Sequence, residues 1–435
     1  MDRSGCPHEG DHIAQGVCHH LWQGSADRFA HRFTGDGLAY DLLCEACAAD
    51  GVGPDPAELA GVCAACFEEV AARGTWSTGD RAVVGEPAIA ERATRLSFNH
   101  EMVRLPALDA PLWDVVPLGG DRSRWLAVTR AGALLQLDLD DRKVAPIAEL
   151  DGAGIEAERE LALVASPDGA LVAALEVFGP SGVVVEVSSG DISMILDRGE
   201  PASGARFPAA FVAPGGRTLL AHATAWNRLD LSDPRSGEQL TRRPASEAAA
   251  HQIQYVSSGL CPSPDGEWLV DNGFTAEAAG LVSAFRVRPW LDDNPFEPDD
   301  GASKRYLCQR WHHWDGPVAW LDGGTLAVQG YGPSRSSLVP AVLLFDVDSG
   351  EALRWFAGPR GPLVVGDIAT QGGSMPLLFS LGDGDGVSVW DPQSGERLLH
   401  DAGFHPLRYH AGARQFLTGN PDGSLFVVSR VAGEL

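Results

Sequence analysis

Short apolar segments separated by turn residues recur from about residue 111 to the end of the chain. The segments are rich in Ala, Val, Leu and Phe, and Gly, Pro, Asp or Ser stands between them. Ser166–Gly169 (SPDG), for example, follows ALVA and precedes ALVAALEV, and Ser263–Gly266 repeats this turn before EWLVDNG. Apolar runs bounded in this way predict β-strands joined in hairpins.

A second turn, with the pattern D-x-x-S-G-E, closes later strands at residues 233–238, 346–351 and 391–396. Equivalent turns lie roughly 40 to 50 residues apart, and one four-stranded propeller blade takes about 40–45 residues. The repeats therefore predict a β-propeller of about seven blades, although six or eight also fit. The expected blades begin near Leu112, Glu160, Arg206, Ser257, Gly316, Leu363 and His405.

The last repeat has strands only to about Val431 and lacks an outer strand. The segment Phe98–Leu105 (FNHEMVRL), which precedes the first repeat, has the composition of a strand. If it pairs with the last repeat, the ring closes and no sheet edge is left open at that point. We therefore expect it to form the outer strand of the last blade.

These repeats resemble the WD40-like propeller family. The resemblance rests on the SPDG turns, the D-x-x-S-G-E turns and one WD dipeptide, Trp390–Asp391, and it covers residues 111–435. The family's Gly-His pair is absent, and only one repeat carries WD. The resemblance implies a mostly β fold that serves as a binding platform more often than as an enzyme, and the fold by itself does not fix function.

The first part of the chain carries a different chemistry, because six of the eight cysteines lie in its first 66 residues among histidines. Two Cys-x-x-Cys pairs, Cys44–Cys47 and Cys63–Cys66, are fifteen residues apart, a spacing typical of structural zinc. Clustered Cys and His in a cytosolic protein favour metal over disulfides. Cys261 and Cys308 stand alone, and we expect them to be packing residues.

The expected zinc ligands are Cys6, His8, Cys18, His19, His20, Cys44, Cys47, Cys63 and Cys66. Only one of His19 and His20 is needed as a ligand. The candidates then form two sets of four ligands, which predict two Zn²⁺ ions. In a sequential scheme, which we favour, the upstream residues hold one ion and the two Cys-x-x-Cys pairs hold the other. In a crossed scheme, Cys6 and His8 join one Cys-x-x-Cys pair, and Cys18 with its histidine joins the other.

Residues 38–43 predict a strand that ends at the first Cys-x-x-Cys pair, and residues 67–73 predict a helix that follows the second. This arrangement resembles a treble-clef zinc finger over about thirty residues, which implies a small α+β fold and no particular partner. A domain of about 70 residues has a marginal core, and structural zinc contributes roughly 10–16 kcal/mol of binding energy. Four-ligand sites leave no open position, so we expect the zinc to be structural.

The expected domains are a zinc-binding module at 1–75, a connector at 76–110 with a short helix over 86–95, and the propeller at 111–435.

Two segments in the propeller have an unusual composition for this fold. Trp311–Asp315 (WHHWD) predicts packing between blades or a partner contact, and Trp290–Asp300 predicts a binding or disordered surface loop. The pattern of Gly382–Gly386 (GDGDG) predicts a hairpin turn rather than a calcium site.

The chain has 435 residues, 44% of them hydrophobic and 21% charged, and a formal net charge of −26. Such acidity disfavours nucleic acid, and residues 1–75 carry four Arg, no Lys and twelve Asp or Glu, a net charge of −8. Lys143 and Lys304 are the only lysines, which suggests a GC-rich bacterial genome. We find no membrane-length apolar run and no signal-peptide pattern, so we expect a cytoplasmic protein without a membrane partner.

These observations favour a non-enzymatic protein–protein interaction scaffold or adaptor with structural zinc. No nucleotide-binding, metalloprotease or serine-hydrolase motif is present. One alternative is a propeller hydrolase or lyase with its site at the axial mouth, which would need inward-facing His, Asp or Glu. Another is an acidic inhibitor or immunity-type protein that neutralises a basic partner, an interpretation that rests on the charge alone.

Overall fold

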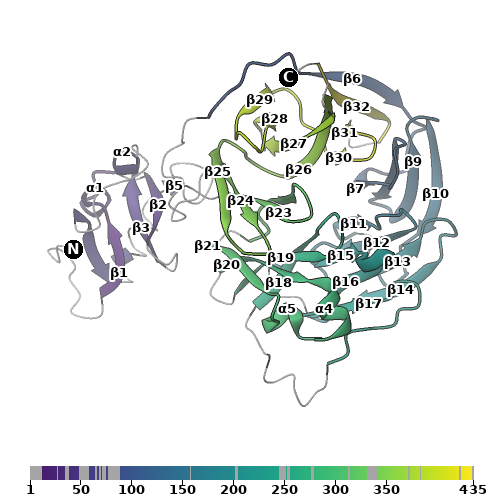
Figure 1. Cartoon of the computed structure of the whole chain (residues 1–435), viewed down its shortest axis with the longest axis horizontal. Helices are drawn as coiled ribbons and strands as arrows, with labels where there is room; N and C mark the ends of the chain where they lie inside the picture. The colour runs from purple at the N-terminus through teal and green to yellow at the C-terminus, as the bar shows by residue number, and fades with distance from the viewer. Residues whose placement is uncertain are drawn as a thin grey trace.

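The structure is a computed structural model that describes residues 12–26, 28–34, 39–48, 58–63, 66–67, 70, 75–76, 89–156, 158–200, 204–243, 251, 255–275, 279–311, 314–330, 340–370, 373–382, 384–420 and 423–433. Its strands belong to one small sheet in the first 76 residues and to a ring of sheets after residue 96. Figure 1 shows this ring, with the sheets arranged radially around a central axis. The protein is therefore mostly β, as its turns and apolar runs predict.

The small sheet has the strand order β4-β1-β3-β2-β5. Its elements are β1 (His12–Val17), α1 (His19–Trp22), β2 (Arg28–Thr34), β3 (Ala39–Cys44), α2 (Glu45–Ala48), β4 (Ala60–Cys63) and β5 (Thr75–Trp76). Val17, Leu42, Leu43 and Leu59 are fully buried in its core. β1 and β3 are parallel, with Val17 opposite Leu42, and this pairing places the residues that follow the two strands side by side.

Among the described residues, the ring consists of seven sheets, six with four strands and one with three. The first two blades contain β7 (Leu112–Pro117), β8 (Arg124–Thr129), β9 (Ala133–Asp138), β10 (Lys143–Glu149), β11 (Leu161–Ala165), β12 (Leu171–Glu176), β13 (Ser181–Glu186) and β14 (Ile192–Asp197). The third and fourth contain β15 (Ala209–Val212), the 3-10 turn η2 (Pro214–Gly216), β16 (Leu219–Ala225), β17 (Arg228–Ser232), β18 (Tyr255–Pro262), β19 (Trp268–Thr275), β20 (Ala279–Arg286), α4 (Val287–Asp292), α5 (Glu297–Asp300) and β21 (Arg305–Trp311).

The fifth and sixth blades contain β22 (Val318–Trp320), β23 (Thr325–Gln329), β24 (Ala341–Asp346), β25 (Ala352–Ala357), β26 (Leu363–Thr370), β27 (Gly373–Gly382), β28 (Gly386–Trp390) and β29 (Arg397–Asp401). The seventh contains β30 (Arg408–His410), β31 (Gln415–Gly419), β32 (Leu425–Ala432) and β6 (Ser97–Arg104). The blades follow one another near the positions that the turn pattern predicts, which confirms the seven-bladed propeller.

The hydrophobic core lies between successive blades. Every residue of the central strand β12 is buried, whereas the outer strand β14 is largely exposed or half-buried. Leu126 and Val128 of the first blade join Leu163 and Val172 of the second in one apolar cluster. Central strands that are buried on both faces explain the near-continuous apolar runs in the sequence.

The ring is closed by the chain segment that precedes the first blade. β6 pairs antiparallel with β32 along its full length, from Arg104 opposite Leu425 to Ser97 opposite Ala432. Val103 is buried and contacts the core shared by the seventh and first blades. The strand predicted at residues 98–105 thus lies at the outer edge of the last blade, where the sequence placed it.

The connector differs from its prediction. Residues 89–95 are not helical, and residues 86–88 lie outside the described part of the chain. Instead, Glu91 forms a parallel bridge with Arg397 of β29, the Arg397 N–H donates to Ala90 O (2.8 Å) and the Arg92 N–H donates to Arg397 O (3.0 Å). Pairing with the edge of the sixth blade gives these backbone groups the hydrogen bonds that a helix would otherwise provide. This pairing outweighs the weak helix propensity of the segment.

The acidic insertion at residues 290–300 is also not a free surface loop. It contains α5 and most of α4, and Trp290 is 1% exposed in the core shared by the third and fourth blades. Asp299 pairs with Arg243, a residue that follows the three strands of that blade. The insertion therefore packs beside the blade that has only three described strands, and this contact explains its apolar and acidic residues.

Candidate functional site

Four metal-ligating side chains gather in the small N-terminal sheet. One ligand atom each of Cys18, His20, Cys44 and Cys47 lies within 4.8 Å of the other three. His20 Nδ1 is 3.3 Å from the Cys47 sulfur and 3.6 Å from the Cys44 sulfur. In a tetrahedral zinc site, Zn–S and Zn–N bonds of about 2.3 and 2.0 Å put nitrogen and sulfur about 3.5 Å apart.

The sequence folds locally so that these residues meet. Cys18 follows β1 and directly precedes α1, whose first turn carries His20. β3 ends at Cys44, and α2 then carries Cys47. The parallel pairing of β1 with β3 joins the two pieces, and the Cys44 N–H donates to the Cys18 sulfur at 3.2 Å.

This cluster corresponds to the crossed scheme. The sequential scheme grouped the Cys44–Cys47 pair with Cys63 and Cys66, but the structure brings that pair to Cys18 and His20. The imidazole in the cluster is that of His20 rather than that of His19. The physical reason is the β1–β3 pairing, which spacing along the chain does not reveal.

The remaining expected ligands are only partly described. Cys6 and His8 lie outside the described residues, as does the side chain of Cys63. Cys63 ends β4, where its backbone lies opposite His12 of β1, and the side chain of Cys66 is buried. The structure therefore shows one Cys/His cluster that fits a metal ion, and the described residues do not complete a second.

The donor set and its surroundings fit Zn²⁺. Cys18 and Cys44 are buried, Cys47 is half-buried and His20 is exposed. Burial, together with the neighbouring Cys44, raises the pKa of Cys18 and raises that of Cys47 to about 12, so these groups are thiols when no cation is present. A bound cation reverses this preference, because metal binding releases thiol protons. Three sulfurs and one imidazole complete a tetrahedral shell, which is the arrangement of a structural site.

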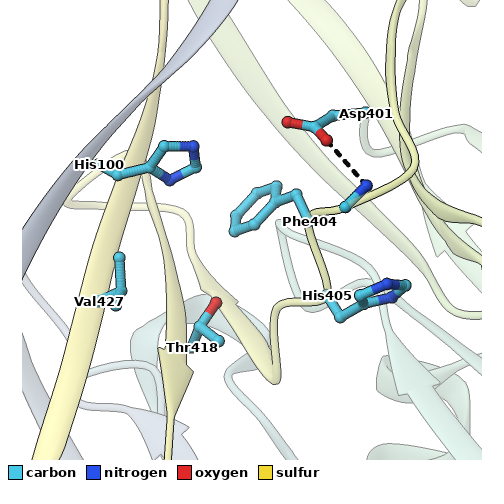
Figure 2. Close-up of a pocket in the computed structure, with 7 residues that line it drawn as sticks. His100, Asp401, Phe404, His405, Thr418 and Val427 are labelled. Carbon is cyan, nitrogen blue, oxygen red and sulfur yellow. Dashed lines mark hydrogen bonds between the residues drawn. The ribbon is translucent and has the colours of Figure 1, made fainter.

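A separate pocket of about 440 Å³ lies in the ring between the sixth and seventh blades. Figure 2 shows its lining, with the Phe404 ring pointing toward the His100 ring and Asp401 beside the loop that carries Phe404. The lining residues are His100, Asp401, Gly403, Phe404, His405, Thr418 and Val427. They come from β6, β29, β31, β32 and one loop, so no local sequence motif could have indicated this pocket.

The WHHWD segment is described only in part, because His312 and His313 lie outside the described residues. Trp314 packs against Phe274, with ring centres 4.7 Å apart, and Asp315 accepts a hydrogen bond from Ser258 Oγ at 2.8 Å. Burial raises the pKa of Asp315. These contacts pack the link between β21 and β22 against the fourth blade, so the described part of the segment has a packing role.

Four described histidines outside the pocket, His222, His251, His400 and His410, do not converge on one site. His222 is buried inside the third blade between Ser232 Oγ and a backbone carbonyl, and His410 is buried against Trp125. His251 pairs with Asp300, and His400 with Ser388. Each of these imidazoles has a local structural partner in a different part of the ring.

No protein-family model and no curated protein sequence matches this chain. Solved structures are similar in fold. A chain in the crystal structure of the mitotic checkpoint complex gives a TM-score of 0.50 at 13% identity, over 81% of this chain and 94% of that chain. The crystal structure of the RRP9 WD40 repeats gives 0.49 at 11% identity, over 76% and 97% of the two chains. At 13% identity, the similarity to the chain of the checkpoint complex shows the fold alone.

The described residues contain no helix that is long and apolar enough to cross a membrane.

Proposed function

We propose that the protein is a non-enzymatic scaffold for protein–protein interaction, with a zinc-stabilised module at its N-terminus. The observation that carries the proposal is a closed seven-bladed ring in which His222, His251, His400 and His410 each have a separate structural partner. Such a ring holds many surface loops on a rigid frame, and loops on rigid frames commonly contain the residues that bind partners. One chain of the solved mitotic checkpoint complex is similar in fold to this chain and belongs to an assembly, which supports this proposal.

Exposed aromatic residues on the loops support the same function. Phe178, in the turn between β12 and β13, is 53% exposed, and Trp226, between β16 and β17, is 47% exposed. Large aromatic side chains are enriched at protein interfaces, where they bury much area at little entropic cost. The Arg206 guanidinium lies 5.9 Å from the centre of the Phe178 ring and adds a second group of the kind that interfaces favour.

The zinc proposal extends to two ions in the crossed arrangement. The first would be held by Cys18, His20, Cys44 and Cys47, and it would supply structural cross-linking only, because the four ligands close its shell. The second would be held by Cys6, His8, Cys63 and Cys66. Support for it comes from the antiparallel pairing of β1 with β4, in which His12, four residues after His8, lies opposite Cys63.

Photo-crosslinking in the full chain tests the scaffold proposal. A photoreactive amino acid replaces Phe178 or Trp226, and the matched control replaces Leu353, which is 56% exposed on the outer strand β25. In a native lysate, we expect a defined protein to be crosslinked from a loop position and not from Leu353. Equal crosslinking from all three positions, or none from any, would contradict the proposal.

A further inference from the structure

We propose that the pocket between the sixth and seventh blades receives a basic side chain, Arg or Lys, of a protein partner. This inference rests on the proposed scaffold function and assigns a chemistry to one place on its surface. It is carried by an aromatic floor, a single carboxylate and an apolar rim that together match a long aliphatic side chain with a cationic end.

The floor of the pocket is aromatic. Phe404 is buried and packs against Phe98 with ring centres 4.7 Å apart. The His100 ring meets Phe404 edge to face at 5.3 Å, and its Nδ1 forms a hydrogen bond with Ser429 Oγ at 2.8 Å. Figure 2 shows the two rings turned toward one another. Aromatic faces attract cations, and guanidinium groups most often.

The charge of the lining is acidic. Asp401 is its only carboxylate, and none of the lining residues is Lys or Arg. Asp401 Oδ1 accepts the Gly403 N–H at 2.9 Å, which fixes the side chain and leaves Oδ2 without a partner among the described residues. A net charge of −26 on the whole chain further raises the local concentration of cations. An anionic ligand is disfavoured on both grounds.

The rim supplies apolar contact for the stem of such a side chain. Met102 is 71% exposed on β6, and it lies directly opposite Val427 of the pocket in the β6–β32 register. Leu407, in the loop after His405, is 44% exposed. Arg and Lys lay their methylene stems along apolar surface while their charged ends reach polar groups. A flexible Met suits a surface that adapts to a partner.

A titration of the full chain tests the inference with a defined probe. The chain contains four methionines, so ¹³C-methyl-Met labelling gives four signals, and Met102→Leu identifies the signal of Met102. The probe is Nα-acetyl-arginine methylamide, and its neutral match is the citrulline compound of the same shape. We expect the arginine probe to shift the Met102 signal saturably and to bind at least about fivefold more tightly than the citrulline probe.

Two variants with the same net charge locate the site. Asp401→Asn keeps the cap on Gly403 but removes the pocket charge, and we expect it to weaken arginine binding about fivefold. The control is Glu101→Gln, which removes the carboxylate next to His100 on β6. Glu101 does not line the pocket, so binding of the arginine probe should stay unchanged. The signals of Met194 and Met375 report whether each variant keeps the wild-type fold.

Several results would overturn the inference: no saturable shift of Met102 up to about 50 mM probe, equal binding of the citrulline probe, or equal weakening by the two variants. The loop crosslinks from Phe178 and Trp226 do not depend on this pocket. Crosslinks that persist while arginine fails to bind would therefore reject the pocket and leave the scaffold function standing.

Discussion

Buried charged residues hold the loops of the ring in place, and Arg198 is the clearest example. It is 2% exposed, and its guanidinium donates to Gly179 O (2.9 Å), Arg206 O (2.7 Å) and Ala205 O (3.1 Å). Burial lowers its pKa to about 10, so it stays protonated at neutral pH. The planar fork of a guanidinium suits three fixed carbonyl acceptors better than a compact ammonium does.

We therefore expect Arg198→Lys to lower the free energy of unfolding by about 1–3 kcal/mol, because at least one buried carbonyl loses its donor. Urea unfolding of the full chain measures the effect. Arg159→Lys, at a half-exposed position, is the control and should change stability by no more than about 0.5 kcal/mol. Equal effects of the two substitutions would contradict this role for Arg198.

Asp271 gives a prediction about pH. It is 3% exposed on β19, and burial, which outweighs a 2.6 Å hydrogen bond from Ser257 Oγ and the nearby charge of Lys304, raises its pKa to about 6. Its pKa in the folded state thus lies above the ordinary value of 3.8. The protonated carboxyl contributes stability below about pH 4, and this contribution is lost as the pH rises through 6.

Asp271→Asn should therefore stabilise the protein relative to wild type at pH 8, by about 3 kcal/mol at most, and have little effect near pH 4. Denaturant midpoints of the two proteins across this range give the comparison. A stabilisation that does not change with pH, or one that grows toward acid, would show that the buried carboxyl does not titrate in this way.

Among the elements, β6 determines whether the ring is closed. Two adjacent side chains of this strand face opposite environments, because Val103 is 3% exposed and Met102 is 71% exposed. Val103→Asp buries a charge in the core shared by the seventh and first blades. We expect this change to cost about 3 kcal/mol or more in the free energy of unfolding.

Met102→Asp is the matched control on the same strand, and it should stay within about 0.5 kcal/mol of wild type. Thermal or urea unfolding of the full chain compares the two. If both substitutions were tolerated equally, β6 would not be packed as the outer strand of the seventh blade.

The elements also show what the sequence could predict. Apolar runs between SPDG and D-x-x-S-G-E turns identify the blades, because these signals are local. The missing outer strand of the last repeat identifies a role for residues 98–105, because closing the ring requires one more strand. The helix predicted in the connector and the disordered loop predicted for residues 290–300 are wrong, because contacts with distant residues decide the structure of both segments. Arg397 pairs with the connector, and Trp290 packs in the core shared by the third and fourth blades.

The candidate sites, too, could be predicted only in part from the sequence. The ligand types of the metal cluster could be read from the chain, because thiols and imidazoles at these spacings have few other uses. Their pairing could not, since it follows from the parallel contact between β1 and β3. The pocket draws on His100 and on residues more than three hundred positions later, so only the closed ring reveals it.

At the scale of the whole molecule, the chain combines a ring that has an apolar cluster at each seam between blades with a small sheet whose described residues form a single cluster. The core of the small sheet draws on a short stretch of chain, whereas each seam between blades has a core of its own. We therefore expect the small sheet to depend on zinc and the ring to be independent of it.

The most direct test of this account is the zinc content per chain in two double variants, measured by elemental analysis on protein purified without added metal. The crossed arrangement predicts two ions in the wild type, one in Cys18→Ser/Cys44→Ser, which disables a single site, and none in Cys44→Ser/Cys63→Ser, which disables both. The reverse order, with none in the first variant and one in the second, would establish the sequential arrangement and contradict the account. A wild-type protein without zinc would contradict it altogether.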